Sequence, residues 1–122
     1  MGDRQVDETQ KSSFVVVFNT DGMGHAPAEL RSRLANIYLQ MLLDSQQLPD
    51  AICFYGGGVK LALDDSPVLE MLHELSARGV YLILCSTCLN YFGLREQVRV
   101  GVVGGMHDIL EAQLRADKVI TL

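Results

Sequence analysis

The stretch VYLILCSTCLNYFGL, from Val80 to Leu94, reads as a buried β-strand that continues directly into a short helix. Its first five residues are apolar or aromatic, which is typical of a strand covered on both faces by other elements. Two thiols, Cys85 and Cys88, follow at the point where this strand ends. The stretch therefore predicts a strand–helix unit that presents a pair of cysteines at the carboxyl end of the strand.

The remainder of the chain repeats this alternation. Further strands are predicted at FVVVF, AICFY and KVITL, with a weaker one inside VRVGVVGG; these segments span residues 14–18, 51–55, 118–122 and 98–105. Helices are predicted from Pro27 onward, from Pro67 to Gly79, after the cysteines, and over 106–115. The pattern predicts an α/β fold, a three-layer α/β/α sandwich with a mostly parallel five-stranded sheet. We expect residues 13–122 to form this single domain and residues 1–12 to be a disordered tail.

Two of the predicted helices carry apolar side chains along one face, and in a third, the helix after Pro67, the side chains of Val68, Leu72 and Leu75 form the predicted buried stripe. In the helix after Pro27, the side chains that share a face are those of Leu30, Leu34, Ile37, Tyr38, Met41 and Leu42. In the helix over 106–115, the aligned side chains are those of Met106, Leu110 and Leu114.

Composition excludes several classes of function. A net charge of −5 and a pI near 5.0 argue against a nucleic-acid partner, because phosphate binding requires a basic face. No apolar run is long enough to span a membrane, and the polar N-terminus has no signal core. Three cysteines without a secretion signal suit free thiols in a reducing compartment. We therefore expect a cytoplasmic protein with no membrane and no nucleic-acid partner.

The carboxyl ends of the strands are the expected place for a site, because open α/β sheets bind ligands at that edge. Seven of the eleven glycines fall in loops that follow strands, beside the two cysteines. Glycine lets a backbone approach a ligand closely and expose its amides. The candidate substrate-binding residues are Asp21, Gly22, Met23, Gly24, Gly56, Gly57, Gly58, Ser86 and Thr87.

No cofactor or metal is expected at this edge. The segment from Asp21 to Gly24 is not a dinucleotide fingerprint, because position 27 is proline where that pattern requires glycine. A structural zinc site needs four ligands, and Cys85 and Cys88 supply only two.

The cysteine pair, Cys85 and Cys88, is the candidate catalytic group. A helix N-terminus favours a thiolate, and Ser86 or Thr87 is positioned to cap that helix. Three functions remain open: a persulfide carrier, a C-x-x-C thiol–disulfide redox protein, and a non-catalytic oligomeric subunit or binding module. The redox function is weakened because thioredoxins place a cis-proline after this motif, whereas all three prolines here precede it.

Two other residues near this edge receive ordinary structural interpretations. Cys53 lies inside a predicted strand and is interpreted as a core residue, because free cysteine packs as a small hydrophobe. Lys60 follows the triple glycine, where it is placed to attract an anion, but it is interpreted as a surface lysine.

Taken in order, several short motifs resemble the DsrE/DsrF-like family of sulfur-relay proteins. The resemblance covers about residues 14–122 and is closest to the C-terminal domain of YedF-type proteins, which are sulfurtransferase-like and associated with selenium metabolism. The motifs that carry it are DGMG at 21–24, YGGGVKL at 55–61, SPVL at 66–69, CSTCL at 85–89, YFGL at 91–94 and ADKVI at 116–120.

The resemblance implies a DsrE-like fold, frequent homo-oligomerisation and, if the protein is an enzyme, sulfurtransferase-like activity. In relay members the acceptor cysteine lies eight residues before a glycine, which assigns that role to Cys85 and makes Cys88 its companion. Relay members often have Arg-Gly where this chain has Phe92-Gly93. The implied partners are sulfur donor and acceptor proteins. YedF-type proteins carry an N-terminal TusA-like domain, so we expect any TusA-like partner of this chain to be a separate protein. The cargo is sulfur or selenium.

Overall fold

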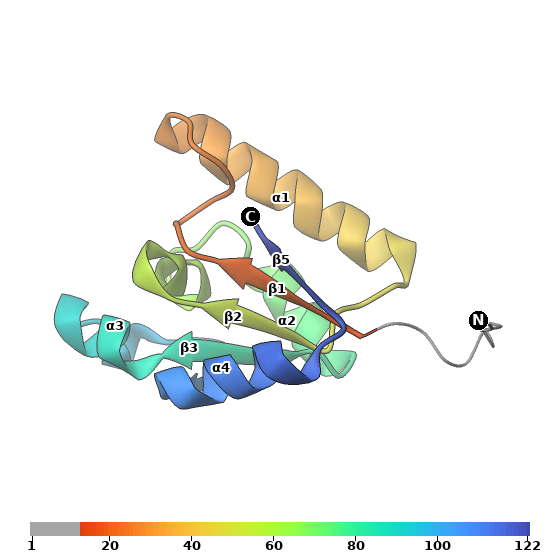
Figure 1. Ribbon diagram of the computed structural model, residues 1–122. Helices are drawn as coiled ribbons and strands as arrows, with labels where there is room; N and C mark the ends of the chain where they lie inside the picture. Colours follow the sequence, from red (N-terminus) through yellow and green to blue (C-terminus); the bar gives the residue numbers. More distant parts are fainter. Residues whose placement is uncertain (1–12) are drawn as a thin grey trace, which may run out of the picture.

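Five parallel strands form one sheet in the order β4-β3-β2-β1-β5 (Figure 1). The structure is a computed structural model that describes residues 13–122, so the predicted tail over 1–12 lies outside the described residues. The elements are β1 (Phe14–Phe18), α1 (Ala28–Ser45), β2 (Ala51–Phe54), the 3₁₀ helix η1 (Gly56–Ala62), α2 (Leu69–Ala77), β3 (Tyr81–Cys85), α3 (Ser86–Phe92), the 3₁₀ helix η2 (Arg95–Gln97), β4 (Val102–Gly104), α4 (Met106–Arg115) and β5 (Lys118–Thr121).

The centre of the sheet is apolar on both faces, which explains why β1, β2 and β3 are nearly continuous hydrophobic runs. Ile52 in β2 pairs with Val16 on one side and with Leu82 on the other, and all three are buried. Phe18 and Phe54 pair at the ends of β1 and β2 and stack with ring centroids 5.8 Å apart. These contacts fix the register in which the strands deliver their carboxyl ends to one edge.

The helices cover the two faces of the sheet unequally (Figure 1). α1 and α2 contact each other on one face, while α4 contacts β3 and β4. The order of the strands explains this division. From β1 to β4 each strand lies beside the one before it, and only the last connection, from β4 to β5, runs back across the sheet to its other edge. Because such crossovers are right-handed, the returning helix α4 covers the opposite face. The predicted α/β/α sandwich is confirmed, with a sheet that is entirely rather than mostly parallel.

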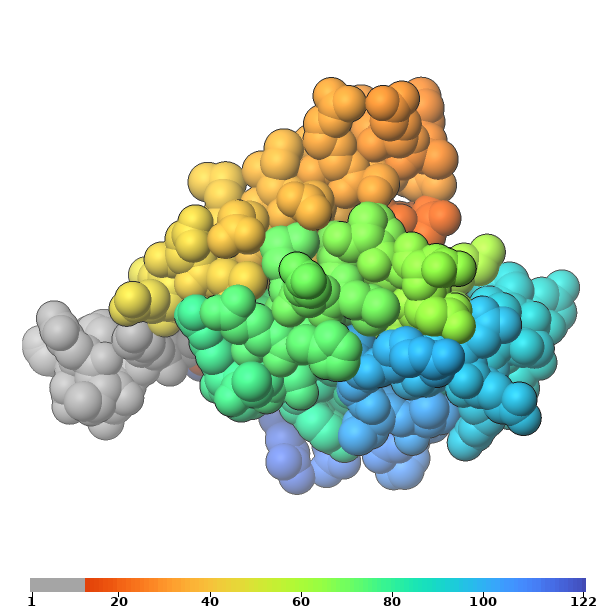
Figure 2. All heavy atoms as spheres, turned by 180° about the vertical axis from the view of Figure 1, so that it is seen from behind, coloured from red at the N-terminus to blue at the C-terminus, as the bar shows by residue number. Residues whose placement is uncertain are grey.

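The apolar face predicted for α1 is largely exposed and is not the face that meets the sheet. The buried residues of this helix are Ala35, Leu39 and Leu43, whereas four of the six predicted residues are exposed, namely Leu30, Leu34, Ile37 and Met41. At about 100° per residue, the buried and exposed sets lie on opposite sides of the helix. α1 is thus apolar on two faces, and the periodicity alone does not say which of them meets the sheet. Seen from behind, α1 lies along the surface above the green segment that contains η1 and α2 (Figure 2).

The aligned apolar residues of α4 are exposed as well. Met106, Leu110 and Leu114 align as predicted, but all three are exposed, and the residue of α4 that is buried is Ile109. The start of α2 also differs from the prediction, because the helix begins at Leu69 rather than at Pro67. Between Gly56 and Ala62 the chain forms the 3₁₀ helix η1, where the sequence predicts a glycine-rich loop. Within residues 13–122, no helix combines the length and the apolar character that crossing a membrane requires.

Candidate functional site at the carboxyl ends of the strands

The parallel sheet brings the predicted loops and the two cysteines to one edge. β1 ends at Phe18 before the loop with Asp21, β2 ends at Phe54 before η1, and β3 ends at Cys85. α3 starts immediately at Ser86, so Cys88 lies in its first turn and faces η1. The edge expected from the sequence therefore exists, and the structure decides how its side chains are arranged.

The two cysteines of this edge differ sharply in accessibility. The side chain of Cys85 belongs to the hydrophobic core and is 0% exposed. Cys88 is partly exposed, and its Sγ accepts a hydrogen bond from the backbone N–H of Gly56 at 3.0 Å. Both are free thiols. A reagent in solution therefore meets Cys88 before Cys85.

Burial raises the pKa of the Cys88 thiol above its ordinary value of 9.0, and a hydrogen bond with Cys85 and the charge of that neighbour raise it further. The Gly56 N–H acts against them, because it stabilises the thiolate. The expectation of a lowered pKa at this helix start is therefore not met for Cys88. Capping by Ser86 or Thr87 is absent too, because Cys85 is the N-cap of α3 and no side chain bonds there.

Two of the glycines predicted to bind substrate are needed for packing. A Cβ on Gly58 would lie 2.1 Å from the Phe18 carbonyl oxygen, and a Cβ on Gly22 would lie 2.5 Å from the Cβ of Arg31. Both glycines are buried. They allow η1 and α1 to approach the end of β1. Met23 likewise packs against the core.

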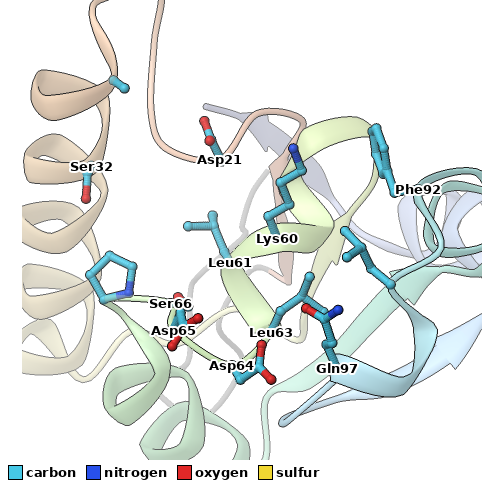
Figure 3. A pocket seen from close by; sticks show the side chains of 13 residues that line it. Asp21, Ser32, Lys60, Leu61, Leu63, Asp64, Asp65, Ser66, Phe92 and Gln97 are labelled. Atoms are coloured by element: carbon cyan, nitrogen blue, oxygen red, sulfur yellow. The ribbon is translucent and has the colours of Figure 1, made fainter.

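Two cavities open beside η1. The larger, of about 620 Å³, lies between α1, η1 and the segment 92–97, and its lining includes Asp21, Lys60, Asp64, Asp65 and Phe92 (Figure 3). The smaller, of about 360 Å³, is lined by Asn19, Thr20, Asp21, Gly24, His25, Ala26, Arg31, Gly57 and Lys60. Of the predicted residues, Asp21, Gly24 and Gly57 thus line a cavity, whereas Ser86 and Thr87 line neither of these two.

Arg31 holds the loop after β1 in place. Its guanidinium pairs with Asp21 at 2.7 Å and donates a hydrogen bond to the Ala26 carbonyl at 2.7 Å. Its backbone carbonyl accepts a hydrogen bond from the Met23 N–H at 3.1 Å. The sequence does not reveal this role, because nothing in the pattern of α1 sets Arg31 apart from its neighbour Arg33.

Lys60 is the second residue whose position the sequence did not reveal. It lines both cavities, and its ammonium lies over the Phe92 ring, 4.9 Å from the centroid. The location of Lys60 after the triple glycine was the available signal. Within residues 13–122, no three His, Cys, Asp or Glu side chains converge in a way that would hold a metal ion.

A comparison against known families identifies the family of this chain. The DsrE/DsrF-like family model matches residues 12–122. The chain belongs to the DsrE/DsrF-like family. Proteins of this family work in sulfur relay, which supports a role of that kind for this chain. No match was found among curated proteins.

Solved structures show the same DsrE/DsrF-like fold. The YchN protein from E. coli is 24% identical with a TM-score of 0.67, and the alignment covers 92% of this chain and 100% of that one. MTH1491, a protein of unknown function from Methanobacterium thermoautotrophicum, is 21% identical with a TM-score of 0.68 and the same coverage. BT1422, a conserved protein of unknown function from Bacteroides thetaiotaomicron, is 18% identical with a TM-score of 0.64, covering 90% of this chain and 95% of that chain. At these identities the likeness establishes the fold alone.

One difference between this chain and the relay members of the DsrE/DsrF-like family concerns position 92. The resemblance places Phe92 where relay members often have arginine, and in the structure the Lys60 ammonium lies over the Phe92 ring. A positive charge is therefore present beside position 92, but it comes from η1 rather than from α3.

Proposed function

We propose that this protein handles sulfur by carrying it as a persulfide on Cys88, with Cys85 as a buried companion thiol. The proposal rests on the difference in accessibility between the two cysteines. Cys88 is partly exposed and accepts the Gly56 N–H at 3.0 Å, whereas Cys85 is enclosed in the core. The resemblance assigned the acceptor role to Cys85. Because a donor must reach the sulfur it loads, accessibility favours Cys88.

The loading step follows from thiol chemistry. The Cys88 thiolate attacks the outer sulfur of a donor persulfide, R–S–SH, and forms a new S–S bond. The S–S bond of the donor breaks, and its inner sulfur leaves as a thiolate, so the products are Cys88–S–SH and R–S⁻. No oxidant is consumed. The Gly56 N–H supports the anion before attack, and an acceptor thiolate removes the outer sulfur by the same step in reverse.

The buried thiol of Cys85 can also react with the loaded Cys88, and this reaction distinguishes a sulfur carrier from a redox protein. Attack by the Cys85 thiolate on the inner sulfur of the Cys88 persulfide forms a Cys85–Cys88 disulfide and releases hydrosulfide, HS⁻. A carrier passes its sulfur to an acceptor faster than this reaction proceeds. A C-x-x-C redox protein instead accumulates the disulfide.

Mass spectrometry tests the assignment. The protein and its Cys85→Ala, Cys88→Ala and Cys53→Ala variants are incubated with a small persulfide donor, and the peptide containing Cys85 and Cys88 is sequenced. We expect one added sulfur on Cys88 in every protein except Cys88→Ala. Loading of Cys88→Ala at the wild-type rate would show that Cys88 is not the acceptor. A selenium donor in the same assay tests whether selenium is also accepted.

A second proposal, supported by a different observation, is self-assembly. The exposed residues of α1, namely Leu30, Leu34, Ile37 and Met41, follow a 4-3-4 spacing, and the exposed fraction of Met41 reaches 65%. This spacing matches the seam of a helix that packs against another helix. Large apolar side chains rarely gather on the surface of a monomer without a partner. We infer that a second copy of the chain covers this face of α1.

The cellular setting follows from the thiol chemistry. Free thiols persist in a reducing compartment, which favours the cytoplasm. There the protein exchanges sulfur with separate donor and acceptor proteins, a TusA-like protein among them, and these exchanges require no cofactor.

A further inference from the structure

Two contacts join η1 to α3. The Gly56 N–H reaches Cys88 Sγ at 3.0 Å, and the Lys60 ammonium lies 4.9 Å from the centre of the Phe92 ring. Gly56 and Lys60 are four residues apart on η1, and Cys88 and Phe92 are four residues apart on α3. On the α-helix α3 this spacing places Cys88 and Phe92 on one face, one turn of about 5.4 Å apart. On the 3₁₀ helix η1, with a rise of about 2.0 Å per residue, Gly56 and Lys60 are further apart, at about 8 Å along the axis. The ammonium of Lys60 is therefore held against Phe92, the residue one turn of α3 away from the accessible thiol.

The charge of Lys60 is not neutralised by the acidic residues nearby. Among residues 13–122, its ammonium forms no ion pair, while Asp21 pairs with Arg31 at 2.7 Å and Asp64 pairs with Arg99 at 3.2 Å. In the close-up, the Lys60 side chain extends between Asp21 and Phe92, away from Asp64 and Asp65 (Figure 3). An aromatic ring attracts a cation but leaves its net charge in place. In the smaller cavity, where Asp21 is paired with Arg31, Lys60 therefore presents a positive charge without an ion-pair partner among the described residues, whereas the larger cavity also holds the carboxylate of Asp65.

We propose that Lys60 recruits small, negatively charged sulfur donors to Cys88. The inference rests on the proposed function, because it names the class of substrate that the thiol accepts. The donor class is a small molecule with an anionic group a few bonds from its transferable sulfur, and thiosulfate is the simplest example. Lys60 acts as a specificity-determining residue: it binds the anionic group while Cys88 meets the sulfur.

With thiosulfate the step balances without an oxidant. The Cys88 thiolate attacks the terminal sulfur of S₂O₃²⁻ and forms the S–S bond of a persulfide. The S–S bond of thiosulfate breaks, and sulfite, SO₃²⁻, leaves with the electron pair. One negative charge on the thiolate and two on thiosulfate become one on the persulfide and two on sulfite. Lys60 stabilises the oxygens that carry the charge on the donor and on the leaving group.

The charge preference is measured with two alkylating reagents that share their chemistry. Iodoacetate is anionic and iodoacetamide is neutral, and both transfer a small group to Cys88. The ratio of their rates, with the modified cysteine identified by mass spectrometry, reports recruitment of an anion independently of sulfur transfer. Lys60→Gln should lower the iodoacetate-to-iodoacetamide ratio roughly three- to tenfold, as expected for the loss of one charge at this range. Lys60→Arg should retain it, and added salt should lower the ratio of the wild-type protein toward that of Lys60→Gln.

Lys118→Gln is the matched control. The Lys118 ammonium also lies over an aromatic ring, that of Phe14, at 5.7 Å, and the substitution changes the net charge equally. Lys118 starts β5 at the opposite end of the strands, so its loss should leave the ratio unchanged. An unchanged ratio in Lys60→Gln, or an equal drop in Lys118→Gln, overturns the proposal.

Thiosulfate loading then completes the test. Lys60→Gln should raise the KM for thiosulfate, measured by sulfite release, and should leave loading from a neutral trisulfide unchanged. If wild-type Cys88 gains sulfur from neither donor, the proposed function fails, and the alkylation ratio still decides the role of Lys60. If both donors load and thiosulfate is insensitive to Lys60, only the inference about Lys60 fails.

Discussion

The backbone N–H of Gly56 donates a hydrogen bond to the Sγ of Cys88, at 3.0 Å, across 32 positions of sequence. Gly56 has φ +57, a conformation that glycine adopts without strain. This backbone geometry directs the amide at the end of β2 toward the thiol in the first turn of α3. The triple glycine thereby contributes to the thiol site through one of its amides, while another of its members, Gly58, is needed for packing.

The first prediction concerns the acidity of Cys88. Cys85 raises the pKa of Cys88 through a hydrogen bond and through its charge. The Cys85→Ala variant should therefore have a lower Cys88 pKa, and Cys88 should react faster near neutral pH. The pH dependence of the iodoacetamide reaction rate measures the pKa. The Cys53→Ala variant serves as the control and should titrate as the wild type does. A Cys88 pKa that stays the same or rises in Cys85→Ala would contradict this account.

A second prediction links Cys53 to stability at alkaline pH. Burial raises the pKa of this thiol to about 11 from an ordinary value of 9.0. The pKa of Cys53 in the folded state lies above its unfolded value. The thiol therefore contributes fully to the free energy of unfolding below pH 9.0, and this contribution is lost as the pH rises through about 11. The loss is on the order of 2–3 kcal/mol in the free energy of unfolding. Burial also raises the pKa of Cys88 and Tyr38, which adds to the decline in the same direction.

Urea unfolding across this pH range isolates the contribution of Cys53. The Cys53→Ala variant is less stable at neutral pH, because it leaves a small cavity, but its stability should decline less between neutral and alkaline pH. Parallel declines in the two proteins would show that Cys53 does not titrate in the folded state.

A third prediction separates neighbouring glycines of η1. A Cβ on Gly58 would meet the Phe18 carbonyl oxygen at 2.1 Å, whereas a Cβ on Gly57 has its nearest neighbour at 3.7 Å. Gly58→Ala should therefore lower the free energy of unfolding by about 3 kcal/mol, because backbone must move to admit the methyl group. Gly57→Ala should be close to neutral. Thermal unfolding of both variants measures the difference, and equal stabilities would argue against the close approach of η1 to β1.

A fourth prediction tests the exposed face of α1. Replacing Ile37 by Asp places a charge in the middle of the proposed contact between copies, and sedimentation velocity should then report a smaller species than the wild type. Asn36→Asp is a matched control, because Asn36 is also exposed on α1 but is not part of the apolar stripe. The fold of both variants is checked by circular dichroism. A wild type that sediments as a monomer would remove the basis of this proposal.

Much of the architecture followed from the sequence because it depends on short-range patterns. The β-branched and apolar runs at 14–18, 51–54 and 81–85 are strands, and helices lie between them. Parallel strands deliver their carboxyl ends to one edge, so the cysteines and the glycine loops were expected together there. In contrast, α1 has apolar residues on opposite sides, and periodicity did not identify the side that packs on the sheet.

The sequence alone determined the parallel sheet, the edge that carries the site and the presence of two thiols at it, because each of these depends on the order and spacing of residues along the chain. Only the tertiary structure decided that Cys88 rather than Cys85 meets solvent, and that Lys60 comes to lie beside Phe92. Accessibility and charge placement arise where segments far apart in sequence pack together. The packing of η1 against α3 brings residues about thirty positions apart into contact, and no local sequence pattern encodes this packing.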